Sequence, residues 1–150
     1  MLNIDGGIET DLTVVCIDNN HFRIISSAAT RERDKFHIKK NLSKDVKIKD
    51  VTDDLCVFGL FGPKSRNLIK TLSKDNFDND DFKFGTAKYI SIDGIKIWTQ
   101  RLSYVGELGY ELYVDFKDAK KIYELIINKG KDFNLSNCGT HAMDLSLIHI

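Results

Sequence analysis

The sequence lacks an excess of charge of either sign, because its 22 lysine and arginine residues are balanced by 22 aspartate and glutamate residues. A chain without net charge has no general attraction for nucleic acid or an anionic membrane, so we expect neither as a partner. It also lacks any apolar run near the roughly 18 residues that span a bilayer. Residues 1–7 have neither the basic nor the apolar region of a secretion signal. These absences predict a soluble domain of the cytoplasmic type.

The sequence offers no metal-binding pattern either. Its four histidines are scattered, and Cys16, Cys56 and Cys138 share no ligand spacing. An odd number of cysteines favours free thiols in a reducing compartment, and such thiols are usually buried core residues. We therefore predict no metal site and no cysteine nucleophile.

Hydrophobic periodicity predicts the fold class. At 150 residues the chain is long enough for one domain with a core. The pattern is that of an α+β protein, with mostly antiparallel sheets and short covering helices. The expected strands are Leu12–Ile17, Phe22–Ser26, Val46–Val51, Leu55–Phe61, Tyr89–Ile92, Ile95–Leu102 and Gly109–Asp115. The expected helices are Thr30–Leu42, Pro63–Leu72 and Ala119–Asn128.

Three local patterns add detail to this picture. The apolar run Leu55–Phe61 is typical of a strand that is buried on both faces. The stretch Ser73–Phe84 is rich in aspartate, asparagine and lysine, so we expect an exposed loop. The pair Asp93-Gly94 predicts a tight hairpin turn between two strands.

The most informative stretch runs from Arg101 to Val114 and holds two glycines, two glutamates and three tyrosines. Glycine and glutamate are depleted in strands, and glycine in a strand often marks a bulge or a close ligand approach. Glu111 resumes the strand pattern, so its carboxylate should have a fixed direction. Such a carboxylate suits a flat ligand with paired N–H donors. The alternative for Tyr104, Glu107 and Glu111 is a surface strand with solvated carboxylates.

A second candidate lies near the start of the chain. The segment Gly6–Leu12 is a glycine turn that leads into a strand, with Asp11 at the mouth of the strand. An aspartate in this position is often only a turn or capping residue. The segment lacks the spacing of a dinucleotide or P-loop motif, so we do not expect it to bind phosphate.

Taken in order along the chain, these segments resemble the folate-binding aminomethyltransferase family, which includes the glycine cleavage T-protein and dimethylglycine and sarcosine dehydrogenases. The resemblance covers residues 1–144. It is carried by Met1–Val14, by Asp50–Gly62 with Pro63, Ser65 and Leu68, by Phe84-Gly85-Thr86, and by Tyr104–Glu111. The sequence Tyr-Val-Gly-Glu-Leu-Gly at residues 104–109 favours the dehydrogenase branch, in which the folate domain is C-terminal.

The resemblance implies a function. Such domains bind tetrahydrofolate and capture a one-carbon unit from an N-methyl amine, in the form of its iminium, as 5,10-methylenetetrahydrofolate. In the dehydrogenase branch a separate FAD domain oxidises the amine, and this chain contains no FAD fingerprint. The family's acidic residue falls on Asp11, as the catalytic group that orients the folate amine or accepts a proton. Its pterin contacts fall on Tyr104 and Glu111, where Glu111 would accept hydrogen bonds from the 2-amino and N3–H groups. A eukaryotic member would belong to the mitochondrial matrix.

Two departures from the family pattern stand out. T-proteins have asparagine near the end of the second strand, where this chain has Ser27, whose shorter hydroxyl is the candidate folate contact here. After Asp144 the family continues with Ser-Leu-Arg-x-Glu, whereas this chain continues through residues 145–150 as Leu-Ser-Leu-Ile-His-Ile. A nucleotide sequence that encodes these six residues resembles the end of a transposase sequencing adapter. The alternative is a chance apolar tail. We therefore interpret residues 1–144 as a partial folate-binding domain and residues 145–150 as a non-native tail.

Four alternatives stay open at the level of the sequence. The chain could belong to a glycine cleavage T-protein or a related folate-dependent demethylase. It could come from a methyltransferase of the same fold that uses a sulfonium methyl donor. It could be a non-catalytic folate-binding module of the kind that assists iron–sulfur assembly, although the cysteine motif of those modules is absent. It could also be a truncated, inactive chain.

Overall fold

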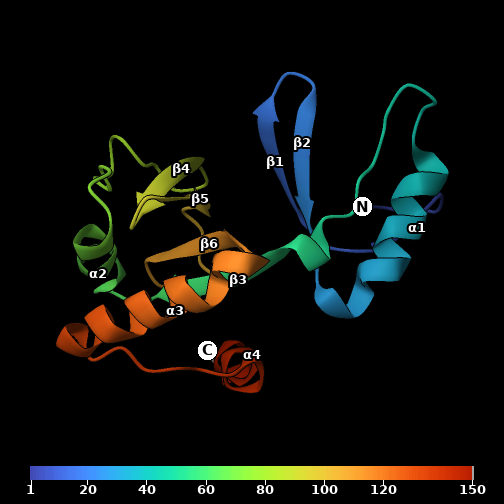
Figure 1. Ribbon diagram of the computed structural model, residues 1–150. Coiled ribbons are helices and arrows are strands. Elements are labelled where there is room, and N and C mark those ends of the chain that lie inside the picture. The colour runs from blue at the N-terminus through green and yellow to red at the C-terminus, as the bar shows by residue number, and fades with distance from the viewer. Residues whose placement is uncertain (150) are drawn as a thin grey trace. The chain divides into compact units, whose positions relative to one another are not determined.

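The computed structural model describes residues 1–149 (Figure 1). Side chains are described for residues 1–145. The chain divides into two compact units, Met1–Asp50 and Val51–Ile150. Among the described residues, no helix combines the length and the apolar character that crossing a membrane requires. Helices and antiparallel strands alternate irregularly along the chain, which confirms the predicted α+β class.

The first unit consists of a hairpin and a helix. Strands β1 (Thr13–Asp18) and β2 (His21–Ile25) pair antiparallel, and helix α1 (Arg31–Asn41) follows a short 3-10 turn. The hairpin and the helix were both predicted. The predicted strand Val46–Val51 is wrong, because this segment has no strand structure. Val46 is 53% exposed, and alternation of apolar residues does not make a strand unless a neighbouring strand offers its backbone groups.

A buried carboxylate ties the first unit together. Asp34 of α1 is only 2% exposed, and it accepts hydrogen bonds from the hydroxyl of Thr30 at 2.5 Å and that of Thr10 at 3.3 Å. Burial raises the pKa of Asp34, but hydrogen bonds from Thr30, Ser26 and Thr10 and the charge of Arg33 outweigh it. The pKa of Asp34 therefore lies below its usual value of 3.8.

This pKa shift makes the first unit sensitive to acid. A carboxyl whose pKa is depressed by folding stabilises the fold above its unfolded pKa, and that contribution is lost as the pH falls through the folded value. We expect Asp34→Asn to destabilise α1 by about 1–3 kcal/mol at neutral pH and to flatten the pH dependence below about pH 4. Amide hydrogen exchange in α1 measures both effects. The exposed Asp45→Asn variant is the control, and equal acid sensitivity in the wild type and Asp34→Asn would contradict the assignment.

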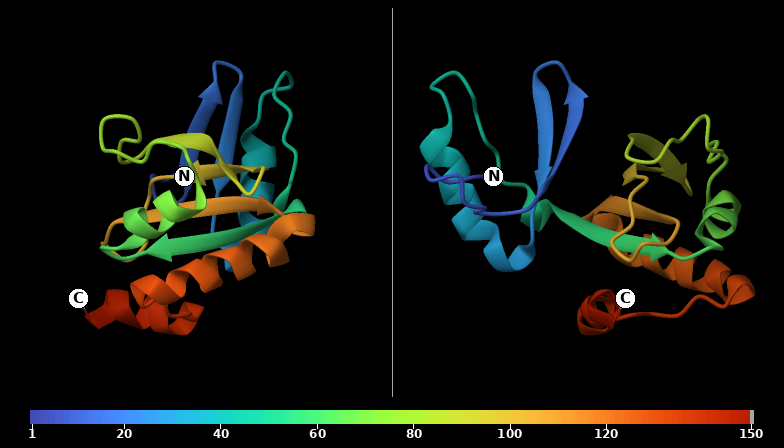
Figure 2. Two further views of the ribbon diagram at one scale, coloured as in Figure 1. Left: turned by 60° about the vertical axis from the view of Figure 1, so that its left-hand side comes forward. Right: turned by 180° about the vertical axis from the view of Figure 1, so that it is seen from behind.

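The second unit is built on one antiparallel sheet with the strand order β3-β6-β5-β4. Its strands are β3 (Leu55–Phe61), β4 (Ala87–Ile92), β5 (Ile95–Gln100) and β6 (Gly109–Asp115). Its helices are α2 (Ser65–Leu72), α3 (Phe116–Gly130) and α4 (Thr140–His149). Helix α3 runs along β3 and β6, and the chain then turns back beside α3 to reach α4 (Figure 2). Helix α4 was not predicted.

The core lies between the sheet and the helices α2 and α3. It combines alternate residues of β6 with apolar residues of both helices, among them Leu112, Val114, Leu68 and Ile122. Strand β3 has the predicted bounds, but it is an edge strand, and Val57 is 52% exposed. The prediction of burial on both faces is therefore wrong. An apolar run alone does not distinguish a central strand from an edge strand.

The polar segment Ser73–Phe84 is a loop, as predicted, but it is not simply exposed. Phe77 and Phe82 are buried in the core, and each ring lies 5.7 Å from the ring of Tyr110. The ammonium group of Lys88 lies 4.7 Å from the centre of the Phe82 ring. Two aromatic anchors thus fix a segment whose composition alone suggests a solvated loop.

The cysteines also depart from expectation. All three are free thiols, as predicted, but Cys16 and Cys138 are exposed and Cys56 is half-buried. The prediction of three buried core thiols is wrong. Cys16 lies on the two-stranded hairpin and Cys138 precedes α4. Among the described residues, neither the hairpin nor α4 contributes to the hydrophobic core.

The glycines of the segment 104–111 have separate structural causes. Gly106 has φ +73° within a bend, a conformation that glycine adopts without strain. Gly109 has an ordinary φ, but a Cβ there would overlap the ring of Phe61 and lie 3.0 Å from the carbonyl oxygen of Leu102. A Cβ on Gly59 would meet the same ring. The ring of Phe61 therefore occupies the space that these two glycines leave.

We expect Gly109→Ala to destabilise the second unit by about 1–3 kcal/mol, because the added methyl group must displace the Phe61 ring. Chemical denaturation followed by circular dichroism measures this loss. Gly139→Ala is the control, since a Cβ at Gly139 meets nothing within 4 Å. In the double variant Gly109→Ala with Phe61→Ala the two effects should be less than additive. Full additivity would show that the methyl group and the ring do not compete.

Candidate functional site

A groove of about 880 Å³ runs along the edge strand β3. Ligand sites of proteins commonly have volumes of about 300–1,000 Å³. One wall is apolar and comes from β3 and α3, with Phe58, Tyr123 and Ile126 among its residues. The rest of the groove lining comes from the bend before β6 and from the segment 135–143, which leads into α4. Tyr104 and Glu111 both line this groove, so the structure brings these two predicted site residues together.

The carboxylate of Glu111 belongs to a hydrogen-bonded network on the sheet face opposite the helices. Its Oε2 atom accepts a hydrogen bond from the Tyr113 hydroxyl at 2.6 Å and one from Gln100 Nε2 at 3.2 Å. Gln100 Nε2 also donates to the Tyr113 hydroxyl at 2.8 Å. Gln100 is 2% exposed and Tyr113 is 6% exposed, whereas Glu111 is half-buried.

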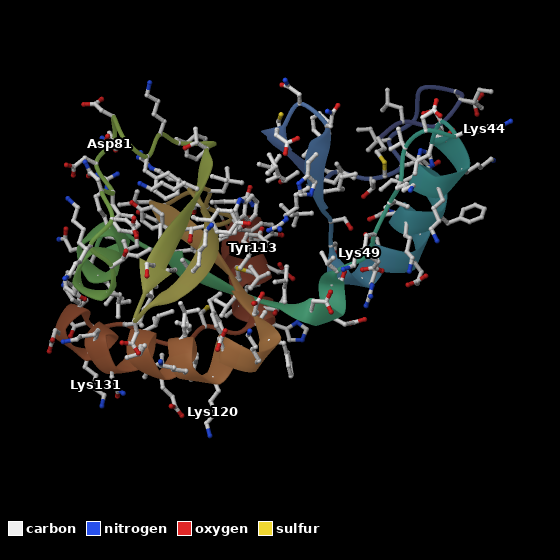
Figure 3. The ribbon with its side chains drawn as sticks, turned by 45° about the horizontal axis from the view of Figure 1, so that its top comes forward. Lys44, Lys49, Asp81, Tyr113, Lys120 and Lys131 are labelled. Atoms are coloured by element: carbon white, nitrogen blue, oxygen red, sulfur yellow. The ribbon has the colours of Figure 1, made fainter. Side chains whose placement is uncertain are left out.

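Strand geometry explains how these three side chains meet. Glu111 and Tyr113 are two residues apart on β6 and share one face of the sheet, as alternate residues of a strand do. Gln100 is the cross-strand partner of Glu111 on β5. Tyr113, which extends from β6 (Figure 3), packs its ring against that of Trp98 with 4.8 Å between ring centres. Two buried donors are therefore held against one oxygen of a half-buried carboxylate.

Sequence reasoning missed Gln100 and Tyr113. A signal for Tyr113 was present, because a residue two positions after Glu111 on a strand must share its face. No comparable signal exists for Gln100, since its place beside Glu111 depends on the register between β5 and β6. A single sequence does not reveal that register.

Tyr104 lies on the bend that precedes β6 and is 52% exposed. Its hydroxyl donates a hydrogen bond to Asp144 Oδ1 of α4 at 3.4 Å. An aromatic ring with one open face at a groove can stack on a planar ligand. Glu107 also lines the groove and is exposed, so its carboxylate keeps contact with solvent.

Asp11 and Ser27 belong to the first unit. Asp11 is exposed just before β1, and its carboxylate has no hydrogen bond or ion pair with the residues that the structure describes. The neighbouring Thr10 donates to the backbone carbonyl of Asp11 at 3.4 Å and to buried Asp34. Ser27 is exposed, and its carbonyl accepts a hydrogen bond from the Thr30 amide. The groove along β3 is formed by residues of the second unit.

Comparison with known proteins relates the chain to a family. The model of the GCVT N-terminal domain matches residues 1–147. Human mitochondrial dimethylglycine dehydrogenase is 34% identical over 147 residues, which cover 96% of this chain and 17% of that protein. An aminomethyltransferase of Thermoanaerobacter sp. (strain X514) is 32% identical over 146 residues, covering 96% of this chain and 39% of that protein.

A third relative and a solved structure agree with these matches. The 4-methylaminobutanoate oxidase (formaldehyde-forming) of Paenarthrobacter nicotinovorans is 29% identical, covering 95% of this chain and 18% of that protein. The heterotetrameric sarcosine oxidase of Corynebacterium sp. U-96, solved with pyrrole 2-carboxylate, is similar with a TM-score of 0.67. That match has 14% identity and covers 87% of this chain and 65% of the other, so it supports the fold alone. The chain thus spans less than half the length of these curated relatives.

Proposed function

This chain belongs to the GCVT N-terminal domain family, and from that membership we propose that it binds tetrahydrofolate in the groove along β3. We further propose that it captures a one-carbon unit from an N-methyl amine of the dimethylglycine or sarcosine type as 5,10-methylenetetrahydrofolate. The single observation that carries the binding proposal is the half-buried Glu111 carboxylate, which lines a groove of ligand size with one oxygen still open.

The residues of the groove fit the chemistry of a pterin ring. A pterin presents its 2-amino group and N3–H side by side as donors, and an ionised carboxylate is a strong acceptor for such donors. Among the described residues, Oε2 of Glu111 already has two donors and Oε1 has none, so Oε1 is the oxygen available to a ligand. Tyr104 would stack on the ring, and the apolar wall formed by β3 and α3 would exclude water.

Asp11 is assigned the catalytic role. Tetrahydrofolate supplies the nitrogen atoms that take up the one-carbon unit. The carboxylate of Asp11 would orient the reacting amine, hold a proton at that nitrogen and stabilise positive charge. The motif of residues 6–12 supports this assignment, together with the exposed carboxylate that no described residue engages. The hydroxyl of Ser27 would contact folate, more weakly than the asparagine that T-proteins have at this place.

The amine itself would be oxidised by a separate FAD-dependent domain or subunit. Relatives that are dehydrogenases or oxidases of N-methylated amines support this division of labour. A second candidate is the aminomethyltransferase of the glycine cleavage system, which the 32% identity to a bacterial aminomethyltransferase favours. In a eukaryote we place the protein in mitochondria, because the human relative is a mitochondrial dimethylglycine dehydrogenase.

Removal of the Glu111 carboxylate tests the binding proposal. We expect the 150-residue chain to bind tetrahydrofolate and Glu111→Ala to weaken that binding by about 10–100-fold, because a hydrogen bond to a charged group is lost. Isothermal titration calorimetry under anaerobic conditions measures both affinities. Glu124→Ala, at an exposed position of α3, is the matched control and should bind like the wild type. A folded wild-type chain that releases no heat with tetrahydrofolate would refute folate binding.

Replacement of Asp11 tests the one-carbon step. In a polypeptide that joins this chain to an amine-oxidising FAD domain, we expect Asp11→Ala to lower the rate of methylenetetrahydrofolate formation by about 100-fold or more. The rate of amine oxidation should change little. Both rates are measured in one reaction, from the folate product and from reduction of the flavin. An equal loss of both rates would contradict the role of Asp11.

A further inference from the structure

We propose that Gln100 and Tyr113 are positioning residues that fix the Glu111 carboxylate for its ligand. This inference rests on the proposed function, since it names the residues through which the folate contact of Glu111 is oriented. Neither residue is in the groove lining, so both would act through Glu111 and not by touching the ligand.

The two oxygens of the Glu111 carboxylate have different partners. Both donors of the network converge on Oε2, from Tyr113 at 2.6 Å and from Gln100 at 3.2 Å. A carboxylate oxygen has room for about two hydrogen bonds, so Oε2 is filled. The network therefore leaves Oε1 as the oxygen available to incoming donors and restrains rotation of the carboxylate.

The two side chains that donate to Glu111 are buried. Gln100 is 2% exposed, and its amide nitrogen donates to Glu111 and to Tyr113. The Tyr113 ring is 6% exposed and is held against Trp98. Buried side chains in regular strands have few rotamers to exchange, so the geometry at Glu111 is set before any ligand arrives.

The polar network of Gln100, Tyr113 and Glu111 is not part of the hydrophobic core. The apolar core lies on the other face of the sheet, around Tyr110, Leu112 and Val114. Burying an amide and a hydroxyl is favourable only when both find partners, and an apolar pair would avoid that requirement. A mobile glutamate side chain loses rotamer freedom when it binds a ligand. A network that fixes Glu111 beforehand would therefore favour binding in the groove.

The test is a double-mutant cycle on tetrahydrofolate affinity. Tyr113→Phe removes only the hydroxyl that donates to Glu111, and we expect binding to weaken about tenfold. Gln100→Leu should have an effect of similar size. In a Glu111→Ala background, Tyr113→Phe should have no further effect, because the carboxylate that it positions is absent. Isothermal titration calorimetry, with higher ligand concentrations for the weaker binders, measures the four affinities of the cycle and that of Gln100→Leu.

The matched control is Tyr110→Phe. It makes the same chemical change on the same strand, but the Tyr110 hydroxyl lies on the core side and accepts from Arg66 at 3.3 Å. This variant should bind like the wild type. The fluorescence of Trp98, the only tryptophan, reports whether each variant is folded around the network. If Gln100→Leu fails to fold, Tyr113→Phe still completes the cycle.

A ligand change separates positioning from general stabilisation. A folate whose 2-amino group is replaced by methyl lacks one donor, and the wild type should prefer tetrahydrofolate over it. We expect Tyr113→Phe to reduce this preference severalfold, and Tyr110→Phe to leave it unchanged.

The outcomes distinguish the two proposals. Wild type that does not bind tetrahydrofolate overturns the proposed function, and the positioning role with it. Binding by the wild type together with unchanged affinity of Tyr113→Phe overturns the positioning role alone. An equal loss from Tyr113→Phe with and without the Glu111 carboxylate also overturns it, because that result means a structural role.

Discussion

The pairing of β6 with both β3 and β5 is the constraint on which the second unit depends. Its backbone hydrogen bonds fix β6 as an inner strand, so its alternate side chains must enter two different environments. Leu112 and Val114 pack into the core, while Glu111 and Tyr113 face the opposite side. One strand therefore contributes to stability and to the candidate site at once. A shift of register by one residue would exchange the two sets and place a carboxylate in the core.

Local patterns predicted the parts of this fold that depend on local physics. The hairpin of β1 and β2, the helix α1 and the strand β6 follow from periodicity and turn residues, and the structure confirms them. The segment Val46–Val51 failed because its alternation found no strand to pair with. The bounds of β3 were predicted correctly, but its burial was not. Its place at the edge of the sheet is a property of the whole topology.

The residues of the candidate site were also predicted only in part. Tyr104 and Glu111 were predicted from the motif, and both line one groove. Their role in ligand binding stays a prediction. The hydrogen-bond partners of Glu111 were not predicted. Gln100 is eleven positions away in the sequence and lies beside Glu111 only because of the register between β5 and β6. The roles of Asp11 and Ser27 stay predictions. The same holds for the predicted tail of residues 145–150, of which residue 150 lies outside the described part of the chain.

The loop Ser73–Phe84 shows how composition can mislead an engineer. Its polar sequence resembles a surface segment that would accept an inserted tag or new chain termini. Yet Phe77 and Phe82 are core residues, and Asp75 accepts a hydrogen bond from the Ser91 amide of β4 at 2.8 Å. Cutting or lengthening the chain between the two rings would remove aromatic packing from Tyr110 on β6. Insertions are better tolerated at the turn Asn19-Asn20, whose residues are exposed and belong to no core.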